Sequence, residues 1–249
     1  MDFYWTFFWA WIGIGVVAFL ASMFVKAPYG RHTRGGWGPS IPNQLGWFLM
    51  EIPTLIFFNY FFLTGPVEKT TVHWVLAAFY NLHYFYRGVI FPFRLRTKGK
   101  SMPMSIALMA ILFNLANGYV LGTWFGTYGE YDNSWLTSAP FLIGTAVFFV
   151  GMGINWWADD ALIKLRKPGE KGYKIPRGGL FEKVSCPNHF GEMLEWTGYA
   201  ILAWALPVAG FAIWTVLNVL PRSLAHHRWY QEKFEDYPAQ RKAVWPGIL

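Results

Sequence analysis

Charged residues are scarce in this sequence, and their scarcity points to the class of protein before any motif is considered. Asp, Glu, Lys and Arg make up 14% of the 249 residues, whereas a soluble domain carries about 25%. Hydrophobic residues make up 54% and aromatic residues 20%. This composition excludes an ordinary soluble domain and indicates a membrane protein with several spans.

Cysteine and histidine are also in short supply. The single Cys186 excludes an internal disulfide and a cysteine metal site, and we interpret it as an inert thiol. The six histidines, of which only His226 and His227 are adjacent, are too few for the clustered ligands of a membrane di-iron enzyme. The sequence also lacks a Walker loop and a Ser–His–Asp signature. We therefore expect neither a metal nor a nucleic acid as a partner.

Long hydrophobic runs are what the sequence has in abundance. The first, residues 3–25, carries no charge and is long enough to cross a hydrocarbon core of about 30 Å. Further spans are predicted near residues 45–64, 72–92, 104–122 and 138–157. The stretch 189–220 is interrupted by Pro207, so it is either one long tilted helix or two short spans that meet near residues 205–207.

The distribution of lysine and arginine among the loops distinguishes these two interpretations. If residues 189–220 cross twice and the N-terminus lies outside, nineteen of the 21 lysines and arginines face the cytoplasm, as the positive-inside tendency favours. The sequence thus predicts an all-α fold with seven transmembrane helices, an outside N-terminus and a cytoplasmic C-terminus. Pro207 suits the first turn of the last helix, where its missing N–H costs nothing. Without repeats or linkers, residues 1–249 are predicted to form a single integral-membrane domain.

Polar residues recur on a helical period where the fifth run ends. Asn155, Asp159 and Arg166 lie at i, i+4 and i+11, so they share one helix face. A loop rich in proline, glycine and basic residues follows, and the next apolar stretch opens with Asn188 and Glu192 on one face. We expect these two segments to direct their polar faces at each other across the basic loop.

Two charges lie deep inside other spans. Glu51 is in the second run and Arg87 in the third, and a charged side chain at mid-helix costs roughly 2.5–3.5 kcal/mol on insertion scales. Tyr84 lies three residues before Arg87 and so nearly shares its face. A structural hydrogen bond between helices explains one such residue, but the three together on consecutive spans indicate a functional site.

Basic residues at the cytoplasmic ends of the spans suit a phosphate group if their loops converge. The candidates are Arg166, Lys174, Arg222 and either Arg96 or Lys98. An alternative interpretation applies to Arg222, His226 and Tyr230, which are spaced i, i+4 and i+8. They would equally suit an interfacial belt of aromatic and basic residues.

Several of these segments resemble the steroid 5α-reductase family, the 3-oxo-5α-steroid 4-dehydrogenases, and in particular its type 2 enzymes. The matching motifs are PYGRH after the first span, WFLMEIP in the second, LHYFYR in the third, then GMGIN, LRKPGE, GYKIPRGGLFEKVS and HHRWYQEKFEDYP. The resemblance covers nearly the whole chain in order and is most specific from residue 151 onward. It implies seven spans and NADPH-dependent reduction of a Δ4-3-ketosteroid, with the cofactor entering from the cytoplasm in a bacterial inner membrane or an endoplasmic reticulum membrane.

The resemblance also assigns roles to residues. It implies that Glu51 and Tyr84 engage the 3-keto oxygen of the steroid. It implies a cofactor-binding set made of Asn155, Asp159, Arg166, Tyr173, Lys174, Asn188, Glu192, Arg222, His226 and Tyr230, to which the basic Arg96 and Lys98 are added as candidates. Two positions depart from the family pattern: Met50 replaces a glutamine of the type 2 enzymes, and Lys174 replaces an arginine.

The implied chemistry agrees with the residue types. A hydride that arrives at the β-carbon of an enone drives negative charge onto the carbonyl oxygen, where donors such as Tyr84 stabilise it. Glu51 would donate as a neutral acid or hold Tyr84 in place. The alternatives are a sterol double-bond reductase or a membrane methyltransferase of the wider superfamily, and a small transporter with intramembrane charges. Partners are expected to be a steroid-like lipid and the membrane itself.

Overall fold

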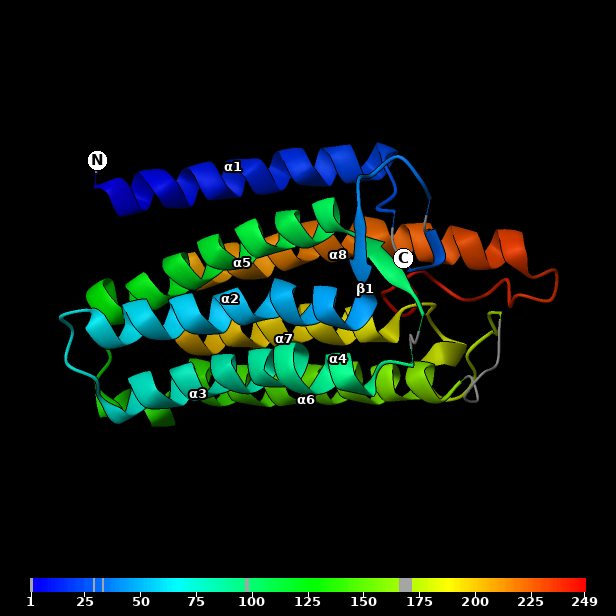
Figure 1. Ribbon diagram of the computed structural model, residues 1–249. Helices are drawn as coiled ribbons and strands as arrows, with labels where there is room; N and C mark the ends of the chain where they lie inside the picture. Colours follow the sequence, from blue (N-terminus) through cyan, green and yellow to red (C-terminus); the bar gives the residue numbers. More distant parts are fainter. Residues whose placement is uncertain (1, 29, 33, 97–98, 166–171) are drawn as a thin grey trace. The chain divides into compact units, whose positions relative to one another are not determined.

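The computed structural model describes residues 2–28, 30–32, 34–96, 99–165 and 172–249, and helices dominate these residues (Figure 1). The long helices are α1 (Phe3–Phe24), α2 (Asn43–Thr64), α3 (Thr71–Phe85), α5 (Met104–Thr123), α6 (Ala139–Lys164), α7 (Pro187–Ala203) and α8 (Leu206–Lys233). Shorter helical segments are η1 (Gly30–His32), η2 (Tyr86–Ile90), α4 (Phe91–Arg94), η3 (Trp124–Tyr128), η4 (Asn133–Thr137) and η5 (Gly179–Glu182). Two short strands, β1 (Ser40–Pro42) and β2 (Ser101–Pro103), pair antiparallel with Ile41 opposite Met102.

Among the described residues, five helices are long and apolar enough to cross a membrane. They are Phe3–Phe24, Asn43–Thr64, Met104–Tyr128, Ala139–Lys164 and Leu206–Lys233. The helical prediction is therefore confirmed. The other two predicted spans are the continuous helical run α3–η2–α4 and the shorter α7. Whether these two also cross, and on which side each terminus lies, stays a prediction.

Two predicted boundaries can be compared directly with the structure. The stretch 189–220 does break, because Trp204 adopts a left-handed conformation with φ 47° and α8 starts at Leu206. Pro207 falls in the first turn of α8, where it is tolerated. The fifth span was predicted to end near residue 157, but α6 continues to Lys164. Asp159 therefore lies on the same helix as Asn155, as their helical spacing predicted.

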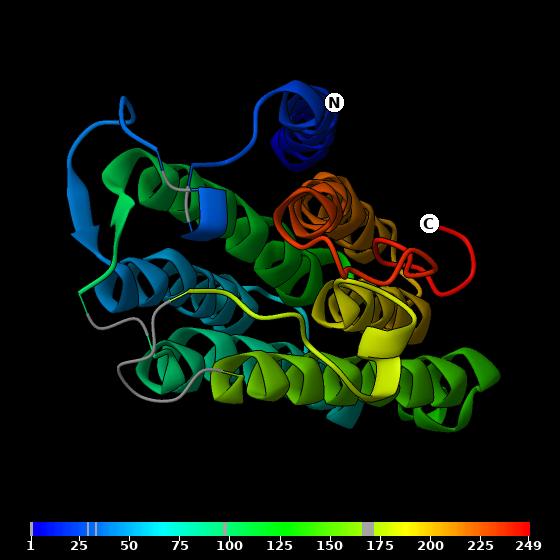
Figure 2. The same cartoon turned by 90° about the vertical axis from the view of Figure 1, so that its right-hand side faces the viewer.

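The chain divides into two compact units. Unit 1 comprises Met1–Ile12, Ala27–Leu142 and Ala205–Val208, and unit 2 comprises Gly13–Lys26, Ile143–Trp204 and Ala209–Leu249. In unit 1, α2 and α5 run side by side (Figures 1 and 2). A Cβ added to Gly118 of α5 would lie 2.9 Å from the carbonyl oxygen of Thr54 in α2. The missing side chain thus allows the two backbones to touch, as small residues do between membrane helices.

In unit 2, glycines likewise allow close backbone contact between α6 and α7, which lie side by side in both cartoon views (Figures 1 and 2). Gly144 and Gly151 of α6 face Gly191 and Gly198 of α7, each pair seven residues apart. A Cβ on Gly151 would lie 2.2 Å from the backbone nitrogen of Glu195, and one on Gly191 would lie 2.5 Å from that of Asn155. This backbone contact brings the polar ends of the two helices together.

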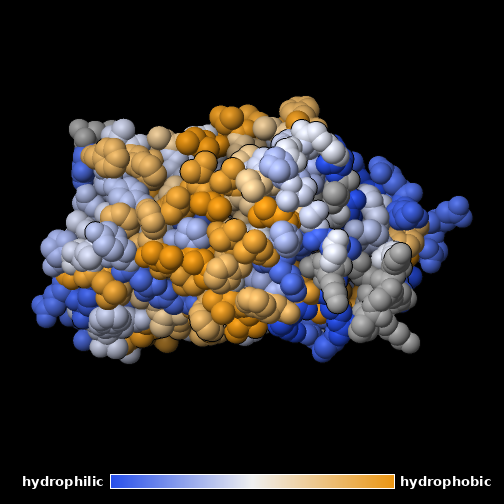
Figure 3. Space-filling view, in the orientation of Figure 1, coloured by the Kyte–Doolittle hydropathy of each residue, from blue (hydrophilic) through white to orange (hydrophobic). Residues whose placement is uncertain are grey.

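The surface of unit 1 is consistent with a lipid environment. Figure 3 shows hydrophobic residues over the middle of α2 and α5. The exposed hydrophobic side chains of these two helices include Leu49, Ile56 and Phe57 of α2 and Leu108 and Leu112 of α5. Such a surface would be unfavourable in water and is expected within a bilayer.

Candidate functional site

The two deep charges of unit 1 lie on α2, which carries Glu51, and on the π-helical turn η2 after α3, which carries Arg87. Arg87 lies in η2, and its Nε is 3.8 Å from Oε1 of Glu51 in α2. The guanidinium group lies 4.8 Å from the ring centroids of both Trp47 and Phe91, a favourable position for a cation. The structure therefore brings together the two intramembrane charges that the sequence singled out, at a π-helical turn of the kind that often marks a functional site.

Asn114 of α5 is a second partner of the Glu51 carboxylate. Its Nδ2 donates to Oε2 of Glu51 at 3.3 Å and to the backbone oxygen of Met50 at 2.6 Å. The side chain of Met50 packs against Met102 and Ala107 in a small buried cluster. The side chain next to Glu51 thus contributes apolar packing, and Arg87 and Asn114 are among the donors around the carboxylate.

Tyr84 is buried beside a second amide of α5. The hydroxyl oxygen of Tyr84 accepts a hydrogen bond of 2.9 Å from Nδ2 of Asn117, and the same nitrogen donates to Tyr80 at 3.0 Å. Asn117 is fully buried, and Tyr84 is 4% exposed. Unit 1 therefore holds a buried set of polar side chains from α2, α3, η2 and α5, and this set is rich in hydrogen-bond donors.

In unit 2, the polar faces of α6 and α7 meet as the sequence predicted. Nδ2 of Asn155 donates to the backbone oxygen of Asn188 at 3.0 Å, and Nδ2 of Asn188 donates to Oδ1 of Asp159 at 3.1 Å. Asn155 is 3% exposed and Asp159 5%. A buried carboxylate and two amides at a junction of helix ends present both acceptors and donors, and so fit the hydroxyl and amide groups of a nucleotide.

Aromatic and imidazole rings accompany this network. The ring of Tyr173 packs against Trp229 with centroids 4.9 Å apart, and His226 stacks on His189 at 5.7 Å. Nδ1 of His189 is 2.8 Å from the hydroxyl of Ser223. Rings of this kind suit the flat bases of a dinucleotide, so the residues of unit 2 fit NADPH chemically.

The remaining predicted site residues differ in their exposure. Lys174 is exposed, Glu192 and Arg222 are half-buried, and Tyr230 is buried against Tyr237 with ring centroids 5.3 Å apart. Arg96 is exposed and belongs to unit 1. Arg166 and Lys98 lie outside the described residues. The predicted convergence of basic groups on a phosphate stays a prediction.

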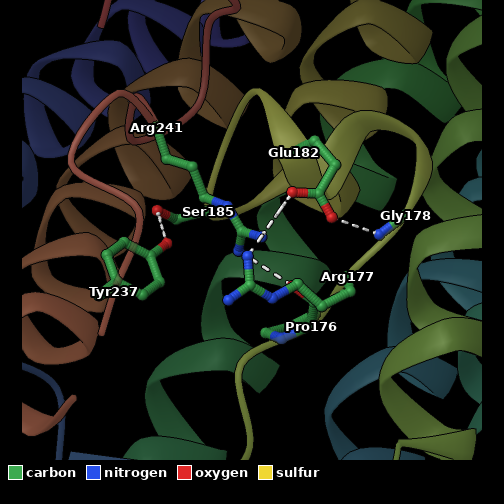
Figure 4. Close-up of polar contacts among 7 residues, drawn as sticks. All are labelled: Pro176, Arg177, Gly178, Glu182, Ser185, Tyr237 and Arg241. Carbon is green, nitrogen blue, oxygen red and sulfur yellow. Dashed lines mark hydrogen bonds and ion pairs between the residues drawn. The ribbon is translucent and has the colours of Figure 1, made fainter. Parts of the chain in front are cut away.

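The C-terminal residues 237–249, here called the C-terminal strap, contact the loop before α7 (Figure 4). This contact was not predicted from the sequence. Arg241 is 1% exposed, donates to the backbone oxygen of Pro176 at 3.0 Å and to Oε2 of Glu182 at 3.1 Å. Backbone hydrogen bonds run from Ser185 N to Lys242 O at 2.8 Å and from Lys242 N to Lys183 O at 2.9 Å. The strap therefore fixes the loop that leads into Asn188.

The charge on Glu182 is part of the same contact. The backbone N–H of Gly178 donates to its Oε1 at 2.7 Å, and Arg241 and Arg177 lie beside its Oε2 at 3.1 and 3.8 Å. The Gly178 N–H, followed by the Arg241 guanidinium, lowers the pKa of the Glu182 carboxyl below its usual value. The ionised form of Glu182 is thus the one that the folded strap favours.

Sequence reasoning missed the amides Asn114 and Asn117. A signal was available, because two amides three residues apart interrupt the apolar run 104–122, and amides within a span usually bond to another helix. Arg241 and Glu182 carried no comparable signal, since both lie in polar segments where charged residues are unremarkable.

Comparison with known proteins adds an independent finding. The family model described as 3-oxo-5-alpha-steroid 4-dehydrogenase matches residues 100–249. The steroid 5-alpha-reductase DET2 of Gossypium hirsutum is 45% identical over 240 residues, which cover 94% of this chain and 93% of that protein. The 3-oxo-5-alpha-steroid 4-dehydrogenase 1 of Bos taurus is 40% identical over 242 residues (95% and 93%), and that of Homo sapiens is 38% identical over 238 residues (95% and 92%).

Proposed function

The chain belongs to the 3-oxo-5-alpha-steroid 4-dehydrogenase family, whose members are oxidoreductases acting on a CH–CH group, and on that premise we propose that it reduces the 4,5 double bond of a Δ4-3-ketosteroid with NADPH. One observation carries the proposal: Tyr84 and Glu51 belong to a buried, donor-rich set of side chains within apolar helices of unit 1. Polar groups at such a depth are costly, and they are retained where they perform a function.

Tyr84 is the proposed donor to the 3-keto oxygen of the steroid. When bound, NADPH would supply a hydride to the β-carbon of the enone. Negative charge then gathers on the carbonyl oxygen, and the Tyr84 hydroxyl stabilises it by donating a hydrogen bond. Such a donor is most effective where water is excluded, and Tyr84 is 4% exposed. Addition of a proton at the α-carbon completes the reduction.

Glu51 has one of two roles in this proposal. As a neutral acid it donates to the same carbonyl oxygen, and as a carboxylate it organises the donors around it. The glutamine of Glu51→Gln can still donate a hydrogen bond but cannot ionise. If Glu51 acts as a neutral acid, Glu51→Gln retains more activity than Glu51→Ala. If Glu51 acts as a carboxylate, the two substitutions are equally damaging. Arg87 and Asn114 both present donors to Glu51, which complements a carboxylate. We therefore expect equal damage, measured as kcat with a Δ4-3-ketosteroid.

Unit 2 is the proposed cofactor-binding part of the chain. Asp159, Asn155 and Asn188 would hold polar groups of NADPH, and Tyr173 and His226 would flank its rings. Arg222 is proposed to contact a phosphate. Arg222→Ala is expected to weaken NADPH binding by about 1.5–3 kcal/mol, the usual worth of a hydrogen bond to a charged group.

The proposed setting is an integral-membrane protein with seven crossings, an outside N-terminus and a cytoplasmic C-terminus, so that unit 2 residues reach cytoplasmic NADPH. The support is the distribution of lysine and arginine together with the helix break before Leu206. Reporter fusions after Leu206 and after Leu249 test it. The two reporters are expected on opposite sides, and the same side for both contradicts seven crossings.

The function itself is tested with the protein purified in detergent micelles, where no gradient can drive transport. NADPH oxidation is expected only when a Δ4-3-ketosteroid is present, and the steroid recovered is expected to be heavier by two hydrogens. Absence of oxidation across a panel of such steroids contradicts the proposal. Methyl transfer from S-adenosylmethionine would support a methyltransferase instead.

A further inference from the structure

The hydroxyl of Tyr84 belongs to a buried group of four side chains whose arrangement the proposed reaction does not by itself require. Three helices contribute to it: Thr54 from α2, Tyr80 and Tyr84 from α3, and Asn117 from α5. Thr54, Tyr80 and Asn117 are each 0% exposed. Four polar side chains buried together are costly unless their donors find acceptors, so the direction of each hydrogen bond matters.

The amide nitrogen of Asn117 is the donor to both tyrosines. It donates to the hydroxyl oxygens of Tyr80 and Tyr84 at 3.0 and 2.9 Å. A tyrosine hydroxyl has a single proton and can also accept. Oδ1 of Asn117 has no hydrogen-bond partner among the described residues, so neither tyrosine gives its own proton to that side chain. The proton of Tyr84 therefore points to another acceptor.

Thr54 determines which hydroxyl donates in the hydrogen bond between Thr54 and Tyr80. Its Oγ1 is 2.5 Å from the hydroxyl of Tyr80, which is also hydrogen-bonded to Tyr84. Within the described residues, Tyr80 is the one hydrogen-bond partner of the Thr54 hydroxyl. If Thr54 only accepted, its proton would be buried without an acceptor, at a cost of about 1–3 kcal/mol. The order Thr54 to Tyr80 to Tyr84 satisfies the protons of Thr54 and Tyr80 in turn, and the Tyr84 proton is given to an acceptor other than these three side chains.

We propose that Asn117 is a positioning residue whose amide holds both tyrosine hydroxyls as acceptors, so that Tyr84 presents its proton to the steroid carbonyl oxygen. The inference rests on the proposed function, because it concerns the same Tyr84. Hydroxyl donors in series polarise one another, so Thr54 and Tyr80 strengthen the donor at the end of the chain. Asn117 acts through Tyr84 rather than on the steroid.

Asn117→Asp is the decisive variant, because it keeps the shape of the side chain and replaces the donor nitrogen by an acceptor oxygen. The Tyr84 proton is then drawn toward residue 117 and away from the steroid. The expected loss in kcat is about 10- to 100-fold, the range for partners that orient a metal ligand without touching the metal. The KM for the steroid and the affinity for NADPH are expected to change little. Full activity would overturn the proposal, since an acceptor at this position would then be sufficient.

A spectroscopic measurement separates positioning from a purely structural role. The probe is a Δ4-3-ketosteroid labelled with ¹³C at its 3-keto carbon, bound together with NADP⁺ so that no turnover occurs. In the wild type a hydrogen bond from Tyr84 shifts the ¹³C resonance downfield. Tyr84→Phe abolishes this shift, and Asn117→Asp reduces it. A wild-type shift in Asn117→Asp overturns the inference alone, whereas a wild-type shift in Tyr84→Phe overturns the proposed function.

Two further variants keep the test conclusive. Asn81→Asp makes the same change on α3, where the Asn59 and Asn81 amides exchange hydrogen bonds of 2.6 and 3.1 Å, and it is expected to lower stability while leaving the ¹³C shift unchanged. Thr54→Val removes the first donor of the chain with little change in shape. If Asn117→Asp does not fold, a reduced shift in Thr54→Val supports the proposal and a wild-type shift overturns it.

Discussion

Units 1 and 2 satisfy their buried polar groups in different ways. In unit 1 the polar atoms lie inside apolar helices, and their partners are mostly other side chains, as between Asn117 and Tyr84 or Arg87 and Glu51. In unit 2 the polar atoms lie where helices end, and backbone groups of loops take part, as between Arg241 and Pro176. The difference suggests that changes in unit 1 act on the chemical step, and that changes in unit 2 act on the order of the loops and on the cofactor.

The largest effect is expected from unit 1. Tyr84→Phe removes the hydroxyl and keeps the ring that packs against Tyr80 at 4.7 Å. Loss of one such donor costs about 10²–10³ in turnover. Steady-state kcat with a Δ4-3-ketosteroid measures the loss, and NADPH binding is expected to stay intact. Wild-type turnover in both Tyr84→Phe and Glu51→Ala would rule out this pair as the group that engages the carbonyl.

The next effect concerns the C-terminal strap of unit 2. Arg241→Ala removes the buried guanidinium group, at a cost of about 3 kcal/mol for hydrogen bonds to a charged group. Cys186 reports the result, because its thiol is buried and its backbone N–H donates to Ala243 O in the strap at 3.1 Å. Labelling of Cys186 by a thiol reagent is expected to accelerate about 100-fold. Arg228→Ala, at an exposed position of α8, is the control, and equal labelling rates in the two variants contradict the role of the strap.

A smaller effect is expected where α6 and α7 touch. Gly151→Ala places a Cβ 2.2 Å from the backbone nitrogen of Glu195, so the helices must separate, at a cost of about 1–3 kcal/mol or more for overpacking. The Asn155–Asn188 hydrogen bond is lost with the contact, and NADPH affinity is expected to fall. Gly153→Ala is the matched control, since nothing lies within 4 Å of its Cβ. A thermal midpoint of Gly151→Ala equal to that of the control would contradict the close approach.

The smallest effect is the pH dependence of the strap. Because the pKa of the Glu182 carboxyl is lower in the folded protein than its usual value of 4.5, its ionisation stabilises the fold above that value. The contribution is lost as the pH falls through the lowered folded pKa. Thermal midpoints of the wild type and Glu182→Gln are expected to differ at neutral pH and to converge in this acidic range. A difference that is constant with pH contradicts a charged Glu182 in the strap.

The sequence predicted most of what depends on local pattern. The apolar runs predicted the helices. Glu51 and Arg87 were identified as candidate site residues because a charged side chain is unusual within an apolar run. The period of Asn155 and Asp159 gave the polar face of α6. Asn117 was missed because an amide carries no charge and is therefore less conspicuous than Glu51 or Arg87 within an apolar run. Its position in a span was nevertheless informative.

Other features could not be predicted in this way. The contact of Arg241 with Glu182 joins residues 59 apart in the chain, and neither residue is unusual in its own segment. The fifth span was predicted to end near residue 157, where the apolar run ends, whereas α6 continues to Lys164 along the helical period of its polar residues. The Arg241–Glu182 contact is decided by packing between distant segments, which a single sequence does not express.

The comparison of the two units leads to one measurement, made in parallel on Tyr84→Phe and Arg222→Ala. NADPH binding is measured at equilibrium, and the rate of a single turnover is measured at saturating NADPH with a Δ4-3-ketosteroid. Tyr84→Phe is expected to bind NADPH like the wild type and to react about 10²–10³ times more slowly. Arg222→Ala is expected to bind NADPH more weakly and to react at nearly the wild-type rate once saturated. Weakened binding in Tyr84→Phe together with a wild-type saturated rate would contradict the assignment of chemistry to unit 1 and of the cofactor to unit 2.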